Sequence, residues 1–299
     1  MPNKEKIAAN VVTYNRKDLL RECLNSLLAQ TRKPDSIIIV DNNSNDGTKE
    51  MLEKEFLDNP IFDYVRLNEN TGSAGGQYTG IKRAYEKGFD WVWCMDDDGS
   101  PSQSALYILL KEKINNALLN CLVVDDKEKE YLGFGLKDRQ TGEKYFLVKE
   151  AQKRKCIYHV NPFNGTLISK KIIKKNGYPD KSFFIYGDEK EYLERIYKNG
   201  FSLVTLTDSI FYHPGVVYKS LVNKEKRDLP AWKRYYLVRN TMRLNTIYKL
   251  GNNFFYFFKS LCEAIFALKQ KRSQIKAVIV GAYHYFLGVY GKYEKAFSF

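Results

Sequence analysis

Three consecutive carboxylates, Asp96, Asp97 and Asp98, follow the apolar run 91–95. Because like charges repel, three adjacent acids at a strand end are a poor choice for stability alone. Carboxylate oxygens are the ligands that Mg²⁺ and Mn²⁺ prefer, and Mg²⁺ commonly keeps coordination positions for substrate phosphates. The triplet therefore predicts a divalent-cation site that serves a diphosphate ligand. Taken alone, it is also consistent with a solvated acidic turn.

The segments before the triplet alternate between strand and helix patterns. β-branched and apolar runs predict strands over 6–13, 36–40, 64–67 and 91–95. Helical spacing predicts helices over 18–29, 48–56 and 74–87. Continuous apolar strands with short helical connections are typical of a parallel sheet buried on both faces. The sequence therefore predicts a doubly wound, mostly parallel α/β domain.

Polar clusters follow each predicted strand, at 13–16, 41–44, 70–76 and 96–98. Each cluster by itself reads as an ordinary turn, because Asn, Asp, Ser and Gly are turn residues. In open α/β sheets, ligands bind outside the carboxyl ends of the strands. Four polar clusters on that one edge therefore indicate a binding site.

The ordered motifs resemble glycosyltransferase family 2, which has the GT-A nucleotide-sugar fold. They read VVTYNR at 11–16, VDNNSNDGT at 40–48, NTGSAGG at 70–76 and MDDDG at 95–99. The resemblance spans about residues 6–215. The acidic triplet, the glycine pair and the segment YGDEKEY at 186–192 look most like bacterial galactofuranosyl and rhamnosyl transferases.

The resemblance implies a donor pocket at the strand ends. A carboxylate such as Asp41 can accept hydrogen bonds from a ribose or base. Tyr14 offers a face for base stacking, with burial in the core as its alternative, and Arg16 can bind phosphate. Glycines before a helix N-terminus allow close approach of an anion. The predicted donor-binding residues are Thr13, Tyr14, Arg16, Asp41, Asn43, Gly72, Gly75, Gly76, Asp96 and Asp97.

For the metal, the resemblance implies Mn²⁺ or Mg²⁺ held by Asp96, Asp98 and a distant histidine, with Asp97 turned toward the donor. His213 fits that third position, since it follows the apolar strand 202–206 and a short connection. His159, in an alternating strand pattern, and His284, in an aromatic run, are predicted to be structural.

Transfer with inversion needs a carboxylate that deprotonates the acceptor hydroxyl. Asp188 and Glu189 open a predicted helix, where acids also serve as ordinary helix caps. In the family the second acid of this pair is the base, which favours Glu189. The order Asp-Glu departs from the commoner pattern, so Asp188 stays an alternative. The residues expected around the acceptor are Asn164, Gly165, Glu191, Trp232 and Arg239, the last as a phosphate ligand.

Charge divides the chain at about residue 215. The first 215 residues carry 32 Lys and Arg against 31 Asp and Glu, whereas residues 216–299 carry 16 against 4. We therefore expect a catalytic domain over 1–215 and a basic helical region over 216–299. Five scattered cysteines without CxxC spacing and a start unlike a secretory signal favour the cytoplasm.

Apolar residues at helical spacing predict an amphipathic helix near the C-terminus: Phe254, Phe258, Leu261, Ile265 and Leu268. Its apolar face could pack on the catalytic domain, form an oligomer, or lie on an anionic membrane surface. The longest late apolar stretch, 277–290, is too short to cross a bilayer, so no membrane span is expected. Attachment at the inner face of the plasma membrane would bring the region near an acceptor carried on a polyprenyl diphosphate.

The predicted function is that of an inverting, metal-dependent glycosyltransferase that builds a bacterial surface polysaccharide, such as a capsule or O-antigen. UDP-galactofuranose is the first choice of donor, and dTDP-rhamnose or a UDP-hexopyranose is the alternative. A nucleotidyltransferase lacks support, since no lysine and glycine-rich start follows the first strand. A nucleic-acid-binding protein that uses the basic tail is the alternative of another class. A catalytically silent scaffold is disfavoured by the intact Asp96–Asp98, Glu189 and His213. We expect no nucleic-acid partner.

Overall fold

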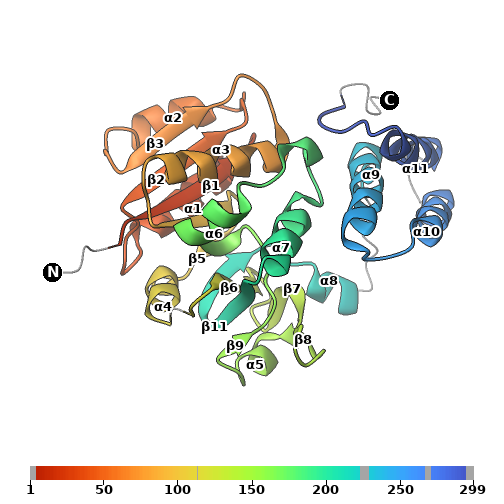
Figure 1. Cartoon of the computed structure of the whole chain (residues 1–299). Coiled ribbons are helices and arrows are strands. Elements are labelled where there is room, and N and C mark those ends of the chain that lie inside the picture. The colour runs from red at the N-terminus through yellow and green to blue at the C-terminus, as the bar shows by residue number, and fades with distance from the viewer. Residues whose placement is uncertain (1–4, 113, 223–228, 267–270, 294–299) are drawn as a thin grey trace. The chain divides into compact units, whose positions relative to one another are not determined.

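The chain begins with alternating strands and helices, as its apolar pattern predicts. The computed structural model describes residues 5–112, 114–222, 229–266 and 271–293 (Figure 1). The first seven elements are β1 (Ile7–Thr13), α1 (Lys17–Leu28), β2 (Ser36–Asp41), α2 (Thr48–Glu55), β3 (Phe62–Arg66), α3 (Gly72–Glu86) and β4 (Trp91–Asp96). The four predicted strands and three predicted helices are confirmed, with small shifts at their ends.

The middle of the chain adds further strands, four α-helices and a 3₁₀ turn. The elements are β5 (Ser100–Pro101), α4 (Ala105–Lys111), β6 (Ala117–Asp125), β7 (Tyr131–Lys137), β8 (Lys144–Leu147), α5 (Val148–Ala151), β9 (Cys156–Ile157), β10 (Asn164–Ser169), α6 (Lys170–Asn176), the 3₁₀ turn η1 (Lys181–Phe183), α7 (Asp188–Lys198) and β11 (Ser202–His213). The helix expected to open with Asp188 is confirmed. The strand expected around His159 is wrong, because β9 ends at Ile157.

The sheet is mostly parallel, which confirms the predicted doubly wound class. Its main path runs β3-β2-β1-β4-β10-β6-β11-β5. β1, β2, β3 and β4 are parallel to one another, and β6 is parallel to β11. β10 lies between β4 and β6 and is antiparallel to both. The carboxyl ends of β1 to β4, β6 and β11 therefore share one edge.

Helices cover both faces of the sheet because successive residues of a strand point to opposite sides. On one face, Val11 of β1 packs in a core with Leu24 of α1 and Leu52 of α2. On the other face, a Cβ at Gly76 of α3 would lie 2.4 Å from Val12 Cγ1. This alternation explains why β1 is buried along its whole length.

The chain divides into two compact units, and the division differs from the expected boundary at residue 215. The first unit comprises the described parts of 1–70, 76–178 and 195–225, and the second those of 71–75, 179–194 and 226–299. The change in charge near residue 215 reflects only amino-acid composition. The compact units are defined instead by which residues contact one another. Asn240, for example, donates to Phe183 O at 2.9 Å and to Tyr186 O at 2.8 Å. These contacts join residues 179–194 to the C-terminal helices.

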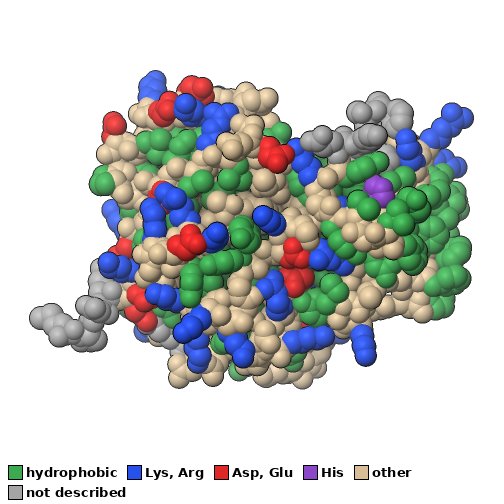
Figure 2. Space-filling model, turned by 45° about the horizontal axis from the view of Figure 1, so that its top comes forward, with side chains coloured by type: hydrophobic (Ala, Val, Ile, Leu, Met, Phe, Trp, Pro, Cys, Tyr) green, Lys and Arg blue, Asp and Glu red, His purple; other side chains and the backbone are tan. Residues whose placement is uncertain are grey.

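The C-terminal region is helical, as predicted. After α8 (Val217–Leu221) come α9 (Ala231–Tyr248), α10 (Asn253–Ile265) and α11 (Lys271–Phe286). The predicted amphipathic helix corresponds to α10, and Leu268 lies outside the described residues. Figure 2 shows hydrophobic side chains gathered on the surface of these helices, with Lys and Arg beside them. Among the described residues, no helix combines the length and the apolar composition needed to cross a membrane.

Candidate active site

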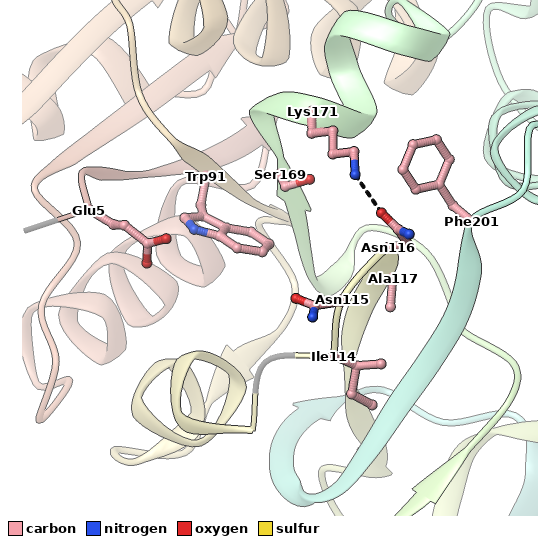
Figure 3. A pocket seen from close by; sticks show the side chains of 9 residues that line it. All are labelled: Glu5, Trp91, Ile114, Asn115, Asn116, Ala117, Ser169, Lys171 and Phe201. Carbon is pink, nitrogen blue, oxygen red and sulfur yellow. Dashed lines mark hydrogen bonds between the residues drawn. The ribbon is translucent and has the colours of Figure 1, made fainter.

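A pocket of about 470 Å³ opens at the amino-terminal edge of the sheet (Figure 3). Its lining residues are Glu5, Trp91, Ile114, Asn115, Asn116, Ala117, Ser169, Lys171 and Phe201. Trp91 and Ala117 begin β4 and β6, so this pocket lies at the edge opposite to the acidic triplet. Lys171 Nζ donates to Asn116 Oδ1 at 2.6 Å, and none of the predicted site residues lines the pocket. Ligands of open α/β sheets bind at the other edge.

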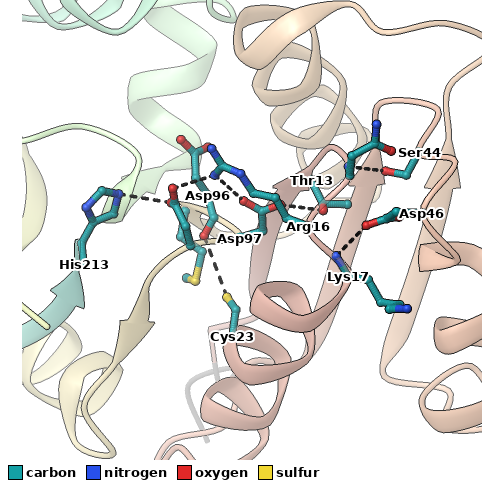
Figure 4. Close-up of polar contacts among 12 residues, drawn as sticks. Thr13, Arg16, Lys17, Cys23, Ser44, Asp46, Asp96, Asp97 and His213 are labelled. Carbon is teal, nitrogen blue, oxygen red and sulfur yellow. Dashed lines mark hydrogen bonds and ion pairs between the residues drawn. The ribbon is translucent and has the colours of Figure 1, made fainter. Parts of the chain in front are cut away.

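At the carboxyl edge, Asp97 is anchored by Thr13, the last residue of β1, and by Arg16, which follows that strand (Figure 4). Thr13 Oγ1 donates to Asp97 Oδ2 at 2.6 Å, and Arg16 Nη1 donates to Asp97 Oδ1 at 3.0 Å. The same Arg16 nitrogen lies 2.6 Å from Asp98 Oδ2. The structure therefore brings the first and fourth predicted polar clusters together, with Arg16 as the counter-ion of two acids.

His213 lies against Asp98, as the prediction of a shared site requires. Its Nε2 is 3.2 Å from Asp98 Oδ1. Its Nδ1 lies 2.9 Å from Pro214 O, and because a carbonyl can only accept, Nδ1 must carry the proton. The expected connection before His213 is wrong. β11 runs without a break from Ser202 to His213 and passes an irregularity between Leu206 and Ile210.

The charges of these groups depend on their burial and their partners. Burial raises the pKa of Asp97 to about 6, although the positive charge of Arg16 opposes the shift. Burial also disfavours the charged form of Asp98, but the bond to His213 outweighs burial and holds the Asp98 pKa below its usual range. Burial lowers the pKa of His213, and the bond to Asp98 reverses this effect and raises it. Asp98 and His213 therefore each favour the charged form of the other.

Asp96 is positioned by Gln77, a residue that the sequence analysis missed. Gln77 Nε2 donates to Asp96 Oδ1 at 3.1 Å, and Gln77 Oε1 accepts from Asn10 Nδ2 at 2.8 Å. Both amide side chains are fully buried. Asn10, a polar residue inside the apolar strand 6–13, could have indicated Gln77 from the sequence. A buried amide in a strand needs a polar partner, and here Gln77 on the covering helix provides it.

The Asp98–His213 pair fits a divalent cation. Ligand atoms about 2.1 Å from a six-coordinate ion lie about 3 Å apart along an octahedral edge, close to the 3.2 Å between Asp98 Oδ1 and His213 Nε2. A metal-binding histidine usually donates its other ring N–H to a carbonyl, as Nδ1 does here. Apart from this imidazole, the buried Asp98 Oδ1 has no partner among the described residues. In the part of the chain that the structure describes, no three acidic, His or Cys side chains form a complete ligand set. The ligand role of Asp96 stays a prediction.

Asp41 is fully buried, which corrects its predicted contact with the nucleoside. Its Oδ1 accepts from Ser44 N at 2.8 Å and its Oδ2 from Tyr64 Oη at 2.8 Å. Asp41 therefore shapes the turn after β2. Asn43 in this turn is exposed with a φ of 64°, and Tyr14 is 44% exposed. These two side chains remain accessible to a donor.

Packing within the protein gives each predicted glycine a structural reason, and their contact with the donor stays a prediction. A Cβ at Gly72 would lie 2.0 Å from Phe184 O, and one at Gly75 would lie 2.2 Å from Thr71 Oγ1. Gly76 likewise packs on β1. The structure therefore explains these glycines by the close packing of α3, which the sequence pattern could not distinguish from close approach to a ligand.

β10 begins with the predicted acceptor residues Asn164 and Gly165 and lies beside the triplet. Asn164 pairs with Met95 across β10 and β4, and Asp96 N donates to Phe163 O at 3.1 Å. Gly165 has a φ of 75°, and a Cβ there would lie 2.7 Å from Cys121 Sγ. Gly165 is thus required by the backbone. Asn164 lies close enough to the triplet for its predicted acceptor role to stay open.

The acids of α7 differ in exposure within the second unit. Asp188 is fully buried, and Glu191 is 7% exposed with its Oε1 2.9 Å from Tyr248 Oη. Glu189 between them is half-buried. Of the predicted pair, Glu189 is therefore the accessible carboxylate.

Arg239 does not fit its predicted contact with phosphate. Its side chain is fully buried, and its guanidinium donates to Gly291 O at 2.8 Å and to Phe183 O at 3.1 Å. It also lies over the rings of Tyr235 and Tyr236. The correction is that Arg239 holds the second unit together. Trp232, in contrast, is 37% exposed.

Comparisons with known proteins agree with the predicted family and fold. The model of glycosyl transferase family 2 matches residues 10–177. The galactofuranosyltransferase GlfT1 of Mycobacterium tuberculosis is 34% identical over 220 residues, which are 70% of this chain and 70% of that protein. A crystal structure of GalNAc-T7 with UDP, GalNAc and Mn²⁺ matches 97% of this chain and 59% of its own, with a TM-score of 0.63 and 16% identity. Residues 1–349 of S. aureus TarS in complex with UDP match 97% of this chain and 93% of their own, with a TM-score of 0.54 and 15% identity. The two solved structures confirm the GT-A fold, and the chain belongs to glycosyltransferase family 2 and is a glycosyltransferase.

Proposed function

We propose that this glycosyltransferase moves galactofuranose from UDP-galactofuranose to a lipid-linked or growing bacterial surface polysaccharide. The choice of sugar is supported by the similarity to GlfT1, which is named a galactofuranosyltransferase. The single observation that carries the chemistry is the Asp98–His213 pair at the carboxyl edge of the sheet. Transfer of rhamnose from a dTDP-sugar, or of a hexopyranose from a UDP-sugar, is the alternative with the same site.

Asp98 and His213 would hold Mn²⁺ or Mg²⁺, with Asp96 as the further candidate ligand. A divalent ion bound there would balance the negative charge of the departing diphosphate. Arg16 would then exchange its contact with Asp98 for a donor phosphate oxygen, since a guanidinium binds either anion. Tyr14 and Asn43 are the exposed side chains proposed to contact the nucleotide.

Glu189 is proposed as the base, because Asp188 is fully buried. The acceptor hydroxyl would give its proton to the Glu189 carboxylate as its oxygen bonds to the anomeric carbon of the donor. The bond from that carbon to the diphosphate oxygen would break, and its electron pair would leave with UDP. Attack from the side opposite to the leaving group inverts the anomeric configuration.

The test measures release of UDP or dTDP from UDP-galactofuranose, UDP-galactopyranose and dTDP-rhamnose, with and without a saccharide acceptor. We expect turnover with UDP-galactofuranose, loss of turnover in EDTA and its recovery with Mn²⁺ or Mg²⁺. Asp98→Asn should abolish the metal response. Asp208→Asn is the matched control, because Asp208 is an exposed acid on the same strand as His213.

Separate readouts distinguish binding from chemistry. Glu189→Gln should keep the rise in melting temperature that UDP and metal produce, yet lower turnover by about 10²-fold or more. Full turnover by Glu189→Gln would refute its role as base. Turnover with dTDP-rhamnose alone would replace the proposed sugar while leaving the site intact.

A further inference from the structure

Helix α10 is apolar on two sides, and packing within the protein accounts for only one of them. Its inner side contributes Ala264 to a buried cluster with Val238 of α9 and Val278 of α11, and Phe257 and Leu261 pack against this cluster. An amphipathic helix that serves only to complete a core would be polar on its solvent-exposed side.

The solvent-exposed side of α10 is instead rich in phenylalanine. Phe254 is 65% exposed, Phe255 72% and Phe258 47%, and Phe266 at the C-cap is 82% exposed. At about 100° per residue, these side chains and Ile265 fall within an arc of about 120°. Large apolar side chains grouped in this way mark a surface that meets another apolar phase.

The neighbouring helix α11 continues this surface and adds positive charge. Ile279, Tyr283 and Phe286 are exposed along its second half. Its first turns carry Lys271 and Arg272, which are also exposed. Cations and apolar side chains therefore occur together on the exposed sides of α10 and α11, as the view in Figure 2 also shows for this region.

Charge indicates which partner covers this surface. The described residues between 229 and 293 include ten Lys and Arg but a single acid, Glu263. Glu263 lies 3.5 Å from Arg234, so part of its charge is already paired. A second copy would bring the same excess of cations against itself, because a two-fold interface uses one surface twice. An anionic lipid surface attracts the cations and accepts the aromatic rings.

We propose that the exposed sides of α10 and α11 form a membrane-binding surface. The phenylalanines enter the boundary between headgroups and acyl chains, and α10 lies in the membrane plane. Lys271, Arg272 and Lys276 contact the headgroups of anionic lipids. This surface acts independently of which sugar the active site transfers.

The test is flotation of the full chain with vesicles of phosphatidylcholine alone or of phosphatidylcholine mixed with an equal amount of anionic phosphatidylglycerol. We expect binding to the anionic vesicles, weakened by high salt, and at least about tenfold weaker binding to phosphatidylcholine alone. The variant Phe254→Ser/Phe255→Ser/Phe258→Ser should lose at least about tenfold in affinity. The control is Leu19→Ser/Tyr107→Ser, which removes exposed apolar side chains from the first unit and should bind as the wild type does.

Three outcomes would overturn the proposal. The triple variant could bind anionic vesicles as tightly as the wild type, or the wild type could show no preference for anionic lipid. Light scattering could also show a wild-type dimer that the triple variant converts to a monomer, which would make a second copy the partner. An unchanged circular dichroism spectrum and an unchanged response of the melting temperature to UDP would establish that the variant is folded. A second variant, Lys271→Glu/Arg272→Glu/Lys276→Glu, should bind anionic vesicles more weakly than the wild type does. Its binding to phosphatidylcholine vesicles should not change.

Discussion

Replacing Asp97 by asparagine is expected to change how the stability of the protein depends on pH. Asp97 is 3% exposed, and burial raises its pKa to about 6 despite the contact with Arg16. An unfolded chain has an aspartate pKa of about 3.9. The folded state therefore holds the Asp97 proton more tightly than the unfolded state does. Its contribution to stability is full below about pH 4 and is lost as pH rises toward about 6.

The size of the effect follows from the interval between the two pKa values. Each pH unit within that interval changes the free energy of unfolding by about 1.4 kcal/mol, so the wild type should lose about 2 kcal/mol from this group between pH 4.5 and pH 6.5. Asparagine does not titrate. The free energy of unfolding of Asp97→Asn, taken relative to the wild type, should therefore rise by about 2 kcal/mol over the same range.

Urea unfolding at pH 4.5, 5.5, 6.5 and 7.5 in EDTA provides the measurement, with each variant compared with the wild type at the same pH. The matched control is Asp18→Asn, because the Asp18 side chain is 77% exposed. Its difference from the wild type should stay nearly constant. A flat or falling difference for Asp97→Asn would refute the account of Asp97 as an acid whose charge is disfavoured by burial.

Three further changes test the packing that supports the site. Gly80→Ala places a Cβ 1.7 Å from Asn10 Oδ1, so overpacking should outweigh the gain in helix propensity and lower the free energy of unfolding by about 1–3 kcal/mol in urea. Arg239→Met removes bonds to buried carbonyls and should cost about 2 kcal/mol or more, measured by calorimetry, with an unchanged melting temperature as the contrary result. Tyr64→Phe takes a donor from Asp41 Oδ2 and should cost about 1 kcal/mol; equal stability in urea would mean that water replaces the hydroxyl.

Local patterns predicted much of the fold. Apolar periodicity is a property of neighbouring residues, so it located the first four strands and three helices with small errors at the ends. The same signal failed around His159, where β9 spans only Cys156–Ile157. It also misplaced the end of β11, because Ser209 and Asp208 interrupt the apolar run while the strand continues.

Residue types and motifs located the candidate functional residues. They did not predict the structural role that several of these residues have. Glycines before a helix indicate close approach, and only the tertiary structure shows that the backbone of Phe184 lies this close to Gly72. Burial likewise separates Asp188 from Glu189 and removes Arg239 from the set of accessible cations. Burial depends on what the rest of the chain places around a residue, which no local window contains.

The sequence alone determined the family, the first four strands and the acids at the end of β4, because these follow from the identities and spacing of neighbouring residues. Tertiary structure decided which of these residues meet. His213 reaches Asp98 only because β11 is parallel to β6 and both strands end at the edge where β4 ends. The pairing of distant strands depends on the packing free energy of the whole sheet, so the geometry of the site appears only when the chain is folded.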